Sequence, residues 1–240
     1  MFLLATALSG NAAVLFSPET TDPDLITALL NAPTAVDRIK LIQNDSDFVY
    51  DFQKPPSQDA IRTGKGGHTV RADRKLFPPL IGTGVAMTVG FLGPCGFNTP
   101  HVHPRASEIN IVVKGALNAE FILENGARPI RTNLTSPFQM TVFPKGAVHM
   151  EFNPTCNDAV FIAGFGDEDP GVQQSAQTFF GLQTDVVAAT LGKGDITIDG
   201  KDIDTFRSLI PANVALGVDE CLKACEINRN ARMRLLKQTW

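Results

Sequence analysis

Three of the four histidines in the chain, together with one glutamate, have the residue types and spacing of a metal site. His101 and His103 are separated by one residue, and Glu108 and His149 follow along the chain. Residues i and i+2 of a β-strand point to the same face, so the side chains of His101 and His103 would aim at one point. Glu108 opens an apolar run, and His149 lies in a second strand-like run. Three imidazoles and one carboxylate that converge inside a β-structure could bind Mn, Fe, Zn, Cu or Ni.

The residues around these side chains fit a sequence pattern in two parts. The matching residues are His101, His103, Glu108 and Gly115 for the first part, and Pro144, Gly146, His149 and Asn153 for the second. On these residues the chain resembles the germin-like branch of the cupins, and within it the spherulin-type proteins of fungi and slime moulds. The resemblance covers roughly residues 86–181. Both parts usually begin with a glycine, whereas Cys95 and Phe138 stand at those places here, a departure that concerns loop conformation and not the ligands.

The hydrophobic pattern is mainly β, with helices towards both ends of the chain. Short apolar runs predict strands at 47–52, 85–92, 108–114, 116–123, 139–143, 148–152 and 159–165. Many short strands at regular spacing indicate a sandwich or barrel, and the resemblance implies a single cupin jelly-roll β-barrel with C-terminal helices. Helices are predicted within 24–41, with a break at Pro33 and Thr34 as a cap, and at 185–191, 203–209 and 218–229.

Residues 53–75 are rich in Gly, Pro, Lys and Arg and are predicted to form a long surface loop. The remaining histidine, His68, is expected to be solvated there, with the glycines around it forming a flexible turn.

The chain divides into four segments. They are a signal-peptide remnant (1–13), an N-terminal extension (14–75), the cupin barrel core (76–181) and a C-terminal helical extension (182–240). The apolar run at 2–8 and the small residues at 10–12 are typical of a signal peptide and its cleavage site. A disordered or packed N-terminus is the alternative. Germin-like proteins are generally secreted, so the resemblance favours secretion, in which case the sequons at Asn44 and Asn133 would accept glycans.

Composition limits the class of partner. The hydrophobic fraction is 43%, which is enough for a sizeable core, and the formal net charge is −4 at pH 7. An acidic balance argues against a nucleic-acid partner, which would prefer a basic surface. No apolar run approaches the ~20 residues that a membrane span requires.

The chain has four cysteines, an even number that suits disulfides in a secreted protein. Cys95 lies just before the first histidine strand and Cys156 just after the last one. Because both strands must reach the metal, we predict a Cys95–Cys156 disulfide. Cys221 and Cys225 are four residues apart in a predicted helix, where an unstrained bridge is not expected. Four reduced thiols are the alternative.

Two further polar residues are expected near the metal. Strand alternation puts Glu151 on the same face as His149, where it could orient a bound water or shuttle a proton; an exposed carboxylate at the barrel mouth is the alternative. Asn98 matches an asparagine that contacts substrate in germin-type oxalate oxidases. A second such asparagine would fall near Thr88, and its absence argues against oxalate as the substrate.

Three functions are compatible with these residues. The resemblance implies a secreted manganese-binding protein that forms trimers or hexamers through terminal helices and binds a small anion or an oxygen species at the metal. The first hypothesis is an oxidoreductase acting on superoxide or oxalate. The second is a structural metal-binding protein of a wall, spore or cyst without turnover. The third is another single-cupin enzyme, such as an isomerase or a dioxygenase. The fold alone does not choose among them.

Overall fold

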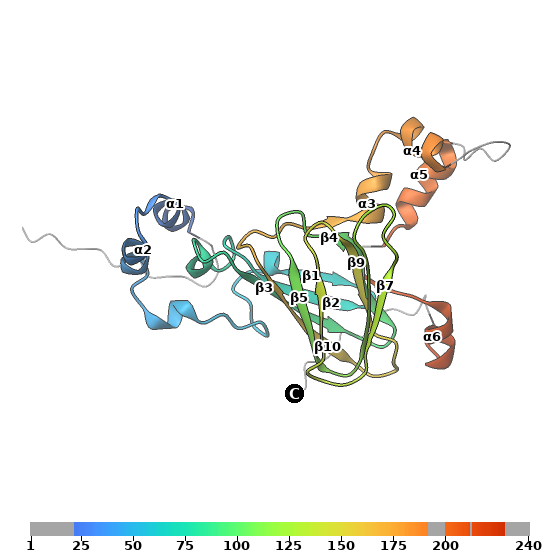
Figure 1. Ribbon diagram of the computed structural model, residues 1–240, viewed down its shortest axis with the longest axis horizontal. Coiled ribbons are helices and arrows are strands. Elements are labelled where there is room, and N and C mark those ends of the chain that lie inside the picture. Colours follow the sequence, from blue (N-terminus) through green and yellow to red (C-terminus); the bar gives the residue numbers. More distant parts are fainter. Residues whose placement is uncertain (1–21, 192–199, 212, 229–240) are drawn as a thin grey trace, which may run out of the picture.

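The computed structural model describes residues 22–191, 200–211 and 213–228, and the predicted signal-peptide remnant lies outside these ranges. Within them, two antiparallel sheets form a barrel at the centre of the molecule (Figure 1). The first sheet has the order β1 (Ile61–Gly64), β2 (Gly67–Ala72), β3 (Ala86–Leu92), β10 (Ala159–Phe165), β5 (Glu108–Lys114) and β8 (Met140–Phe143). The second has the order β11 (Gln173–Gln174), β4 (Gly96–Val102), β9 (Val148–Phe152), β6 (Leu117–Ile122) and β7 (Ile130–Leu134), with β12 (Val214–Leu216) paired to β4.

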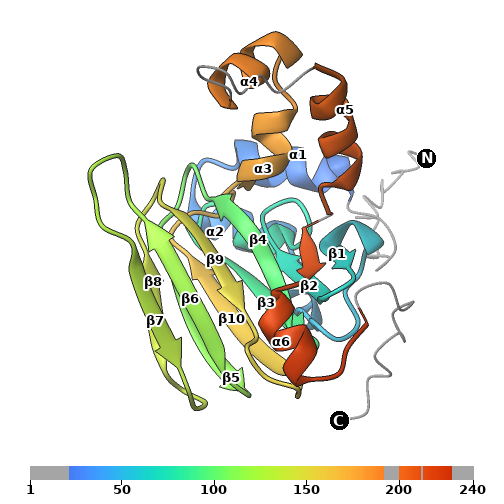
Figure 2. The same cartoon turned by 90° about the vertical axis from the view of Figure 1, so that its right-hand side faces the viewer.

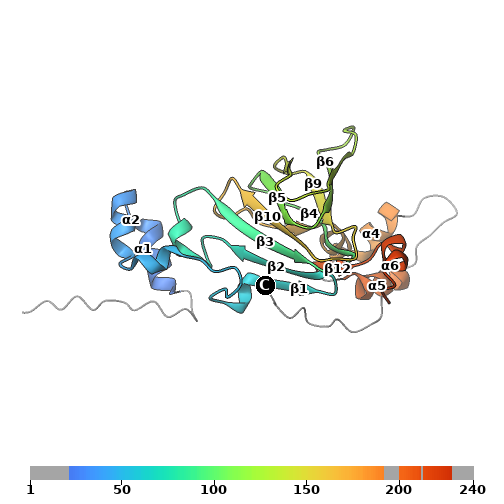
Figure 3. The same cartoon turned by 90° about the horizontal axis from the view of Figure 1, so that it is seen from below.

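Helices lie beyond both ends of the barrel, as Figures 1 and 3 show. On one side are α1 (Pro23–Asn31) and α2 (Ala35–Leu41); on the other are α3 (Ser175–Phe180), α4 (Thr184–Leu191), α5 (Gly200–Leu209) and α6 (Asp219–Ala224). The predicted break at Pro33 is confirmed, and the Thr34 hydroxyl caps α2 by accepting a hydrogen bond from the Asp37 amide at 3.1 Å. No helix within the described ranges is long and apolar enough to cross a membrane.

Strand alternation separates the barrel interior from its outer surface. In β5, the side chains of Glu108, Asn110 and Val112 are buried, whereas Ile109 between them is 54% exposed. The apolar side chains that point inward form one core, which consists of Ala86, Leu92, Ala106, Val112, Leu117, Leu134, Phe161, Ala163, Phe165 and Val214. Burial of a side chain such as Phe161 stabilises the fold by about 1.5–3 kcal/mol. The polar inward residues of the same strands are therefore held by a packed apolar frame.

The prediction of a surface loop at 53–75 is wrong, because this segment contains β1 and β2. The glycines that suggested flexibility instead permit close backbone contact. A Cβ on Gly64 would lie 1.7 Å from the Val214 carbonyl oxygen, and one on Gly66 would lie 1.8 Å from that of Ala215. This approach joins the first sheet to β12 and hence to β4. His68 lies in β2 with its ring stacked on Phe91.

The strand predicted at 47–52 is also absent, since residues Asp45–Phe48 form a 3₁₀ helix. The Asn44 side chain donates a hydrogen bond to the Asp47 carboxylate at 3.1 Å, and the Asp47 amide donates to the Asn44 carbonyl at 3.0 Å. These local bonds favour a turn over the extended pattern that the alternating residues suggested.

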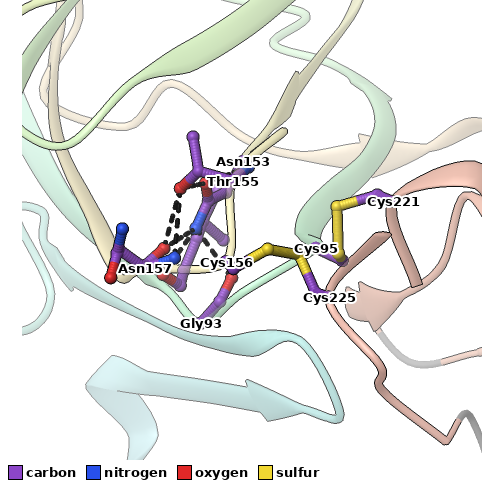
Figure 4. Close-up of a disulfide and its surroundings, with 9 residues drawn as sticks. Gly93, Cys95, Asn153, Thr155, Cys156, Asn157, Cys221 and Cys225 are labelled. Carbon is purple, nitrogen blue, oxygen red and sulfur yellow. Dashed lines mark hydrogen bonds between the residues drawn. A yellow bond between two sulfur atoms is a disulfide. The ribbon is translucent and has the colours of Figure 1, made fainter. Parts of the chain in front are cut away.

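The predicted Cys95–Cys156 disulfide is wrong, because the structure pairs Cys95 with Cys221 and Cys156 with Cys225. Figure 4 shows both bonds side by side between the barrel loops and the α6 segment. Residues four apart on a helix lie on one face, so Cys221 and Cys225 can each reach a different loop. The two loops are not bonded to each other; instead, each one is bonded to the α6 segment.

Two non-glycine residues adopt left-handed backbone conformations where the sequence pattern usually has glycine. They are Cys95, with φ 57°, and Phe138, with φ 70°. This conformation costs roughly 1–2 kcal/mol for a residue with a Cβ. The loops therefore keep the conformation that glycine favours even though both glycines are missing.

We expect peptide mapping of the non-reduced protein to recover the Cys95–Cys221 and Cys156–Cys225 peptides. The first bond joins residues separated by 126 positions and the second by 69 positions. A disulfide closing a loop of about 100 residues stabilises a fold by about 4.7 kcal/mol in the chain-entropy picture. The paired serine substitution at Cys95 and Cys221 should therefore lower the unfolding midpoint strongly, and the pair at Cys156 and Cys225 slightly less. A Cys95–Cys156 peptide in the digest would contradict the structure.

Phe138→Gly should raise the free energy of unfolding by about 1 kcal/mol, because it relieves left-handed strain. The Phe138 side chain is 79% exposed, so little packing is lost. Val49 serves as the control, since it is 74% exposed but has an ordinary extended φ of −108°. Val49→Gly should not stabilise the protein, because glycine only adds freedom to the unfolded chain there. Equal effects of both substitutions in urea denaturation would refute the strain argument.

Candidate metal centre

The four predicted ligands come together in the barrel interior. β4 pairs with β9 so that His101 lies opposite His149, while His103 follows the end of β4 and Glu108 begins β5. All four side chains are buried, and their ligand atoms lie within 4.8 Å of one another. The site therefore draws on both sheets, and its geometry depends on how the two sheets close.

Backbone carbonyls fix the orientation of each imidazole. The Nδ1 atom of His101 lies 2.9 Å from the Thr99 carbonyl oxygen, and Nδ1 of His149 lies 2.9 Å from that of Ala147. His103 Nδ1 bonds the Gly171 carbonyl in the same way. A carbonyl only accepts, so each Nδ1 carries the proton and the lone pair of each neutral ring stays on Nε2. This arrangement is typical of histidine ligands to a metal.

The Nε2 atoms of two of these rings face the same carboxylate oxygen. Glu108 Oε2 lies 3.3 Å from His103 Nε2 and 3.2 Å from His149 Nε2. With Nδ1 protonated, each Nε2 of a neutral ring is an acceptor, and so is the carboxylate. Acceptors this close are stable only with a cation between them, either a proton or a metal ion. The donor set thus fits a divalent metal bound through three imidazole nitrogens and one carboxylate oxygen.

The electrostatics of the site favour the metal-binding protonation state of two of the four residues, Glu108 and His101. Burial would raise the pKa of Glu108, but its hydrogen bonds and charge interactions with His103 and His149 outweigh this and hold the pKa well below its usual range. Burial, together with the two neighbouring histidines, lowers the pKa of His101 to about 3. His149 is also buried, yet Glu108 and Glu151 raise its pKa. Glu108 therefore stays ionised and His101 stays neutral near neutral pH.

Glu151 points into the same interior, as strand alternation predicted, and it is only 1% exposed, so the alternative of an exposed carboxylate is wrong. Its Oε2 accepts from Asn98 Nδ2 at 3.0 Å, and its Oε1 accepts from Asn110 Nδ2 at 3.1 Å. Asn110 Nδ2 also donates to Glu108 Oε1 at 3.0 Å, linking the two glutamates. Burial and the charge of Glu108 raise the pKa of Glu151 to about 8.

Sequence reasoning missed Asn110, although the signal was present. It follows Glu108 by two residues, so alternation in β5 puts both side chains on the inner face. The structure also places Asn98 on the inner face of β4, as expected, and Thr88 of β3 lines the same cavity. The side chains of Asn44 and Asn133, the two candidate glycan acceptors, are exposed.

A cavity of about 400 Å³ opens onto the site. Its lining includes His101, His103, Glu108, Glu151 and Asn98 from the metal centre, and Phe161, Ala163 and Phe165 from β10. The volume lies in the range of small-molecule sites, and an apolar wall with a few convergent polar groups is their usual composition.

A sequence model of the cupin family matches residues 54–196, which include the whole barrel from β1 to β11. The chain belongs to the cupin family. The predicted resemblance and the predicted fold are thereby confirmed, and the match begins before β1, in agreement with the two strands found in the expected loop.

Relatives of this cupin include spherulins and germin-like proteins. It is 45% identical over 203 residues to Spherulin-1A of Physarum polycephalum, covering 85% of this chain and 79% of that protein. It is 31% identical over 213 residues to Germin-like protein 8-2 of Oryza sativa subsp. japonica, covering 86% and 96%. Among solved structures, recombinant oxalate oxidase in complex with glycolate is similar with a TM-score of 0.61 and 25% identity, over 71% of this chain and 84% of the other.

The raised pKa of Glu151 predicts a pH-dependent effect of Glu151→Gln in metal-free protein. Below pH about 4.5 the carboxyl is protonated in both the folded and the unfolded chain. As pH rises from 4.5 towards about 8, the unfolded chain loses this proton while the folded chain keeps it, so the wild type loses stability. Glutamine has no such proton to lose. The stability of Glu151→Gln relative to wild type should therefore increase over this pH interval.

Denaturant unfolding at pH 5, 6.5 and 8 measures this difference. Glu120→Gln is the matched control, because Glu120 lies on β6 outside the cavity and pairs with Arg131. Its difference from wild type should not follow the Glu151 curve. A Glu151→Gln difference that is flat or falls with pH would show that this carboxyl is not held protonated.

Proposed function

We propose that this cupin is a secreted, manganese-dependent oxidoreductase that acts on superoxide or on a small carboxylate such as oxalate. The observation that carries the proposal is the convergence of imidazole lone pairs and the Glu108 carboxylate on one buried point beside a cavity. Such a centre is accessible to a small molecule but closed to a large one. Fold and family alone would not support a reaction, because cupins host many chemistries.

Manganese suits the site and follows from the germin resemblance. Three nitrogen donors and one oxygen donor do not select a metal by affinity, which generally favours copper or zinc over manganese. Four protein ligands leave one or two positions of an octahedral ion open. A bound manganese ion would supply those positions to the anion and could change its oxidation state.

The two buried glutamates would have different roles. Glu108 would hold the metal as a carboxylate, whereas Glu151, whose pKa burial raises in the metal-free protein, would give or accept a proton at its carboxyl oxygens. Asn98 and Asn110 fix the Glu151 carboxyl between them. Two superoxide ions and two protons give dioxygen and hydrogen peroxide, and oxalate, dioxygen and two protons give two carbon dioxide molecules and hydrogen peroxide. Both reactions consume protons, so a proton source near the metal ligands suits either one.

Two observations support secretion and assembly. Both disulfides suit an oxidising compartment, and the sequons at Asn44 and Asn133 are accessible to glycans. The outer face of the first sheet exposes apolar side chains, namely Val85, Met87, Ile109 and Val142. Exposed apolar patches commonly mark protein interfaces. We infer a homo-oligomer, trimer or hexamer, with terminal helices contributing to the contacts.

A structural metal-binding protein without turnover is the second candidate. The 45% identity to Spherulin-1A favours it. Under this proposal the same four residues hold the metal, but the open positions serve no reaction.

The deciding experiment is metal analysis by plasma mass spectrometry of secreted protein never exposed to chelator, with oxalate and superoxide assays on the same sample. We expect near-stoichiometric manganese with turnover in the wild type, and loss of both in His101→Ala. His68→Ala is the matched control and should keep both, because His68 lies on the outer face of β2. Chelation should also lower thermal stability, by about 2.7 kcal/mol if the metal was at 100 times its Kd.

Each outcome separates the candidates. Manganese without turnover on any assayed substrate supports the structural role. Zinc alone, or no metal, contradicts manganese chemistry. Equal metal content in His101→Ala and wild type would show that the metal is not bound at the proposed site.

A further inference from the structure

A second polar group lines the metal cavity from the opposite end of the first sheet. Val70 and Ile61 pack together outside the barrel, so the alternate residues Arg71 and Arg62 point inward. The register agrees, because Arg71 lies opposite Thr88 and Arg62 lies opposite Thr69. Both arginines line the same cavity as His101 and Glu108. The inner face of β1 and β2 therefore contributes two arginines to the cavity wall, next to the apolar residues of β10.

The Arg71 side chain forms an ion pair with Asp73, but its Nε–H donor makes no hydrogen bond. Its Nε atom is buried and has no hydrogen-bond partner. The Asp73 carboxylate lies 3.4 Å from it without the geometry of a hydrogen bond, and the other Asp73 oxygen accepts from the amides of Lys75 and Leu76. A buried guanidinium donor without an acceptor is costly unless a ligand supplies one.

Asp169, another acidic residue of the cavity lining, is already paired. Asp169 lies 2.8 Å from Arg105 and 3.6 Å from Arg74, and both of these contacts are ion pairs. Arg62 directs one terminal nitrogen to the backbone carbonyls of Asp59 and Ile61, and among the described residues no carboxylate forms an ion pair with it. Asp73 offsets part of the charge of Arg71, whereas Arg62 adds positive charge at the same end of the cavity, so this end can still accept an anion.

The distance between Arg71 and the metal centre determines how long a ligand must be to reach both. One inward row runs from Arg71 through Thr88 and Ala163 to Asn110, which bonds the metal ligand Glu108. Neighbouring strands are about 4.8 Å apart, so the three steps of this row correspond to roughly 14 Å between backbones. Side chains projecting from both ends shorten the gap. Oxalate, whose carboxylates share one bond, would still not span it.

Resting on the proposed metal site, we propose that the cavity binds a dicarboxylate longer than oxalate, with one carboxylate at the metal and the other at Arg71. Arg62 adds positive charge at the same end. A guanidinium binds a carboxylate through two parallel hydrogen bonds, which favours a carboxylate over a neutral group. Thr88 is the neighbour of Arg71 across β2 and β3, and the resemblance to oxalate oxidases puts their second asparagine near this position.

Calorimetric titration with matched pairs of acids tests the proposal. Malonate, succinate and glutarate are each compared with the monocarboxylate of the same carbon number, and oxalate with acetate. In manganese-loaded wild type, we expect at least one longer dicarboxylate to bind ten-fold or more tightly than its monocarboxylate. Arg71→Gln should abolish that advantage, and Arg71→Lys should keep part of it. Arg131→Gln is the matched control, because Arg131 is exposed on β7 and pairs with Glu120. It should bind like wild type.

The titration measures binding and not activity. Metal content and thermal stability are measured on every variant, so a loss of the metal or of the fold is seen separately. If the wild type holds no manganese, the proposed function fails, and the same acid pairs titrated into metal-free protein still measure the contribution of Arg71. The proposal is overturned if every dicarboxylate binds no better than its monocarboxylate, or if the advantage survives in Arg71→Gln.

Discussion

The contact between the Glu108 carboxylate and the Nε2 atoms of His103 and His149 constrains the rest of the barrel. These atoms are all acceptors once the backbone carbonyls have fixed the Nδ1 protons, so they can lie 3.2–3.3 Å apart only around a shared cation. Their backbones belong to different sheets. The barrel must therefore close tightly enough to bring β4 and β9 of one sheet against β5 of the other, and its apolar core provides that closure.

Features far from the metal serve the same closure. Gly64 and Gly66 let the turn between β1 and β2 approach β12, which pairs with β4, the strand that carries His101. The view in Figure 2 shows α6 lying beside this group of strands. The Cys95–Cys221 bond fastens α6 to the loop just before β4. Cys95 thus occupies a left-handed position that glycine usually fills, and a covalent link offsets the conformational cost.

The barrel interior carries glutamates at one end and arginines at the other. Glu108 and Glu151 share Asn110 as a hydrogen-bond donor, yet their surroundings push their pKa values in opposite directions. One carboxylate is adapted to hold a cation and the other to hold a proton. Arg71 and Arg62 add positive charge at the far wall. A cavity with a metal centre, a proton-holding acid and an arginine is suited to a small anionic ligand, and its walls are set by strands whose inward residues alternate with the outer surface.

The sequence by itself identified the four candidate metal ligands, the inward direction of Glu151 and most of the strands, because each follows from spacing within a strand or a short motif. The break before Thr34 followed from local capping chemistry. Only the tertiary structure decided the disulfide pairs, since these depend on where α6 packs and not on which loops share the metal. The tertiary structure also decided that the glycine-rich segment around His68 forms strands. Glycine occurs both in flexible loops and where two backbones approach closely, so the sequence could not distinguish the two. The position of Arg71 across the sheet from the metal came likewise from strand register, which brings together residues that no local pattern connects.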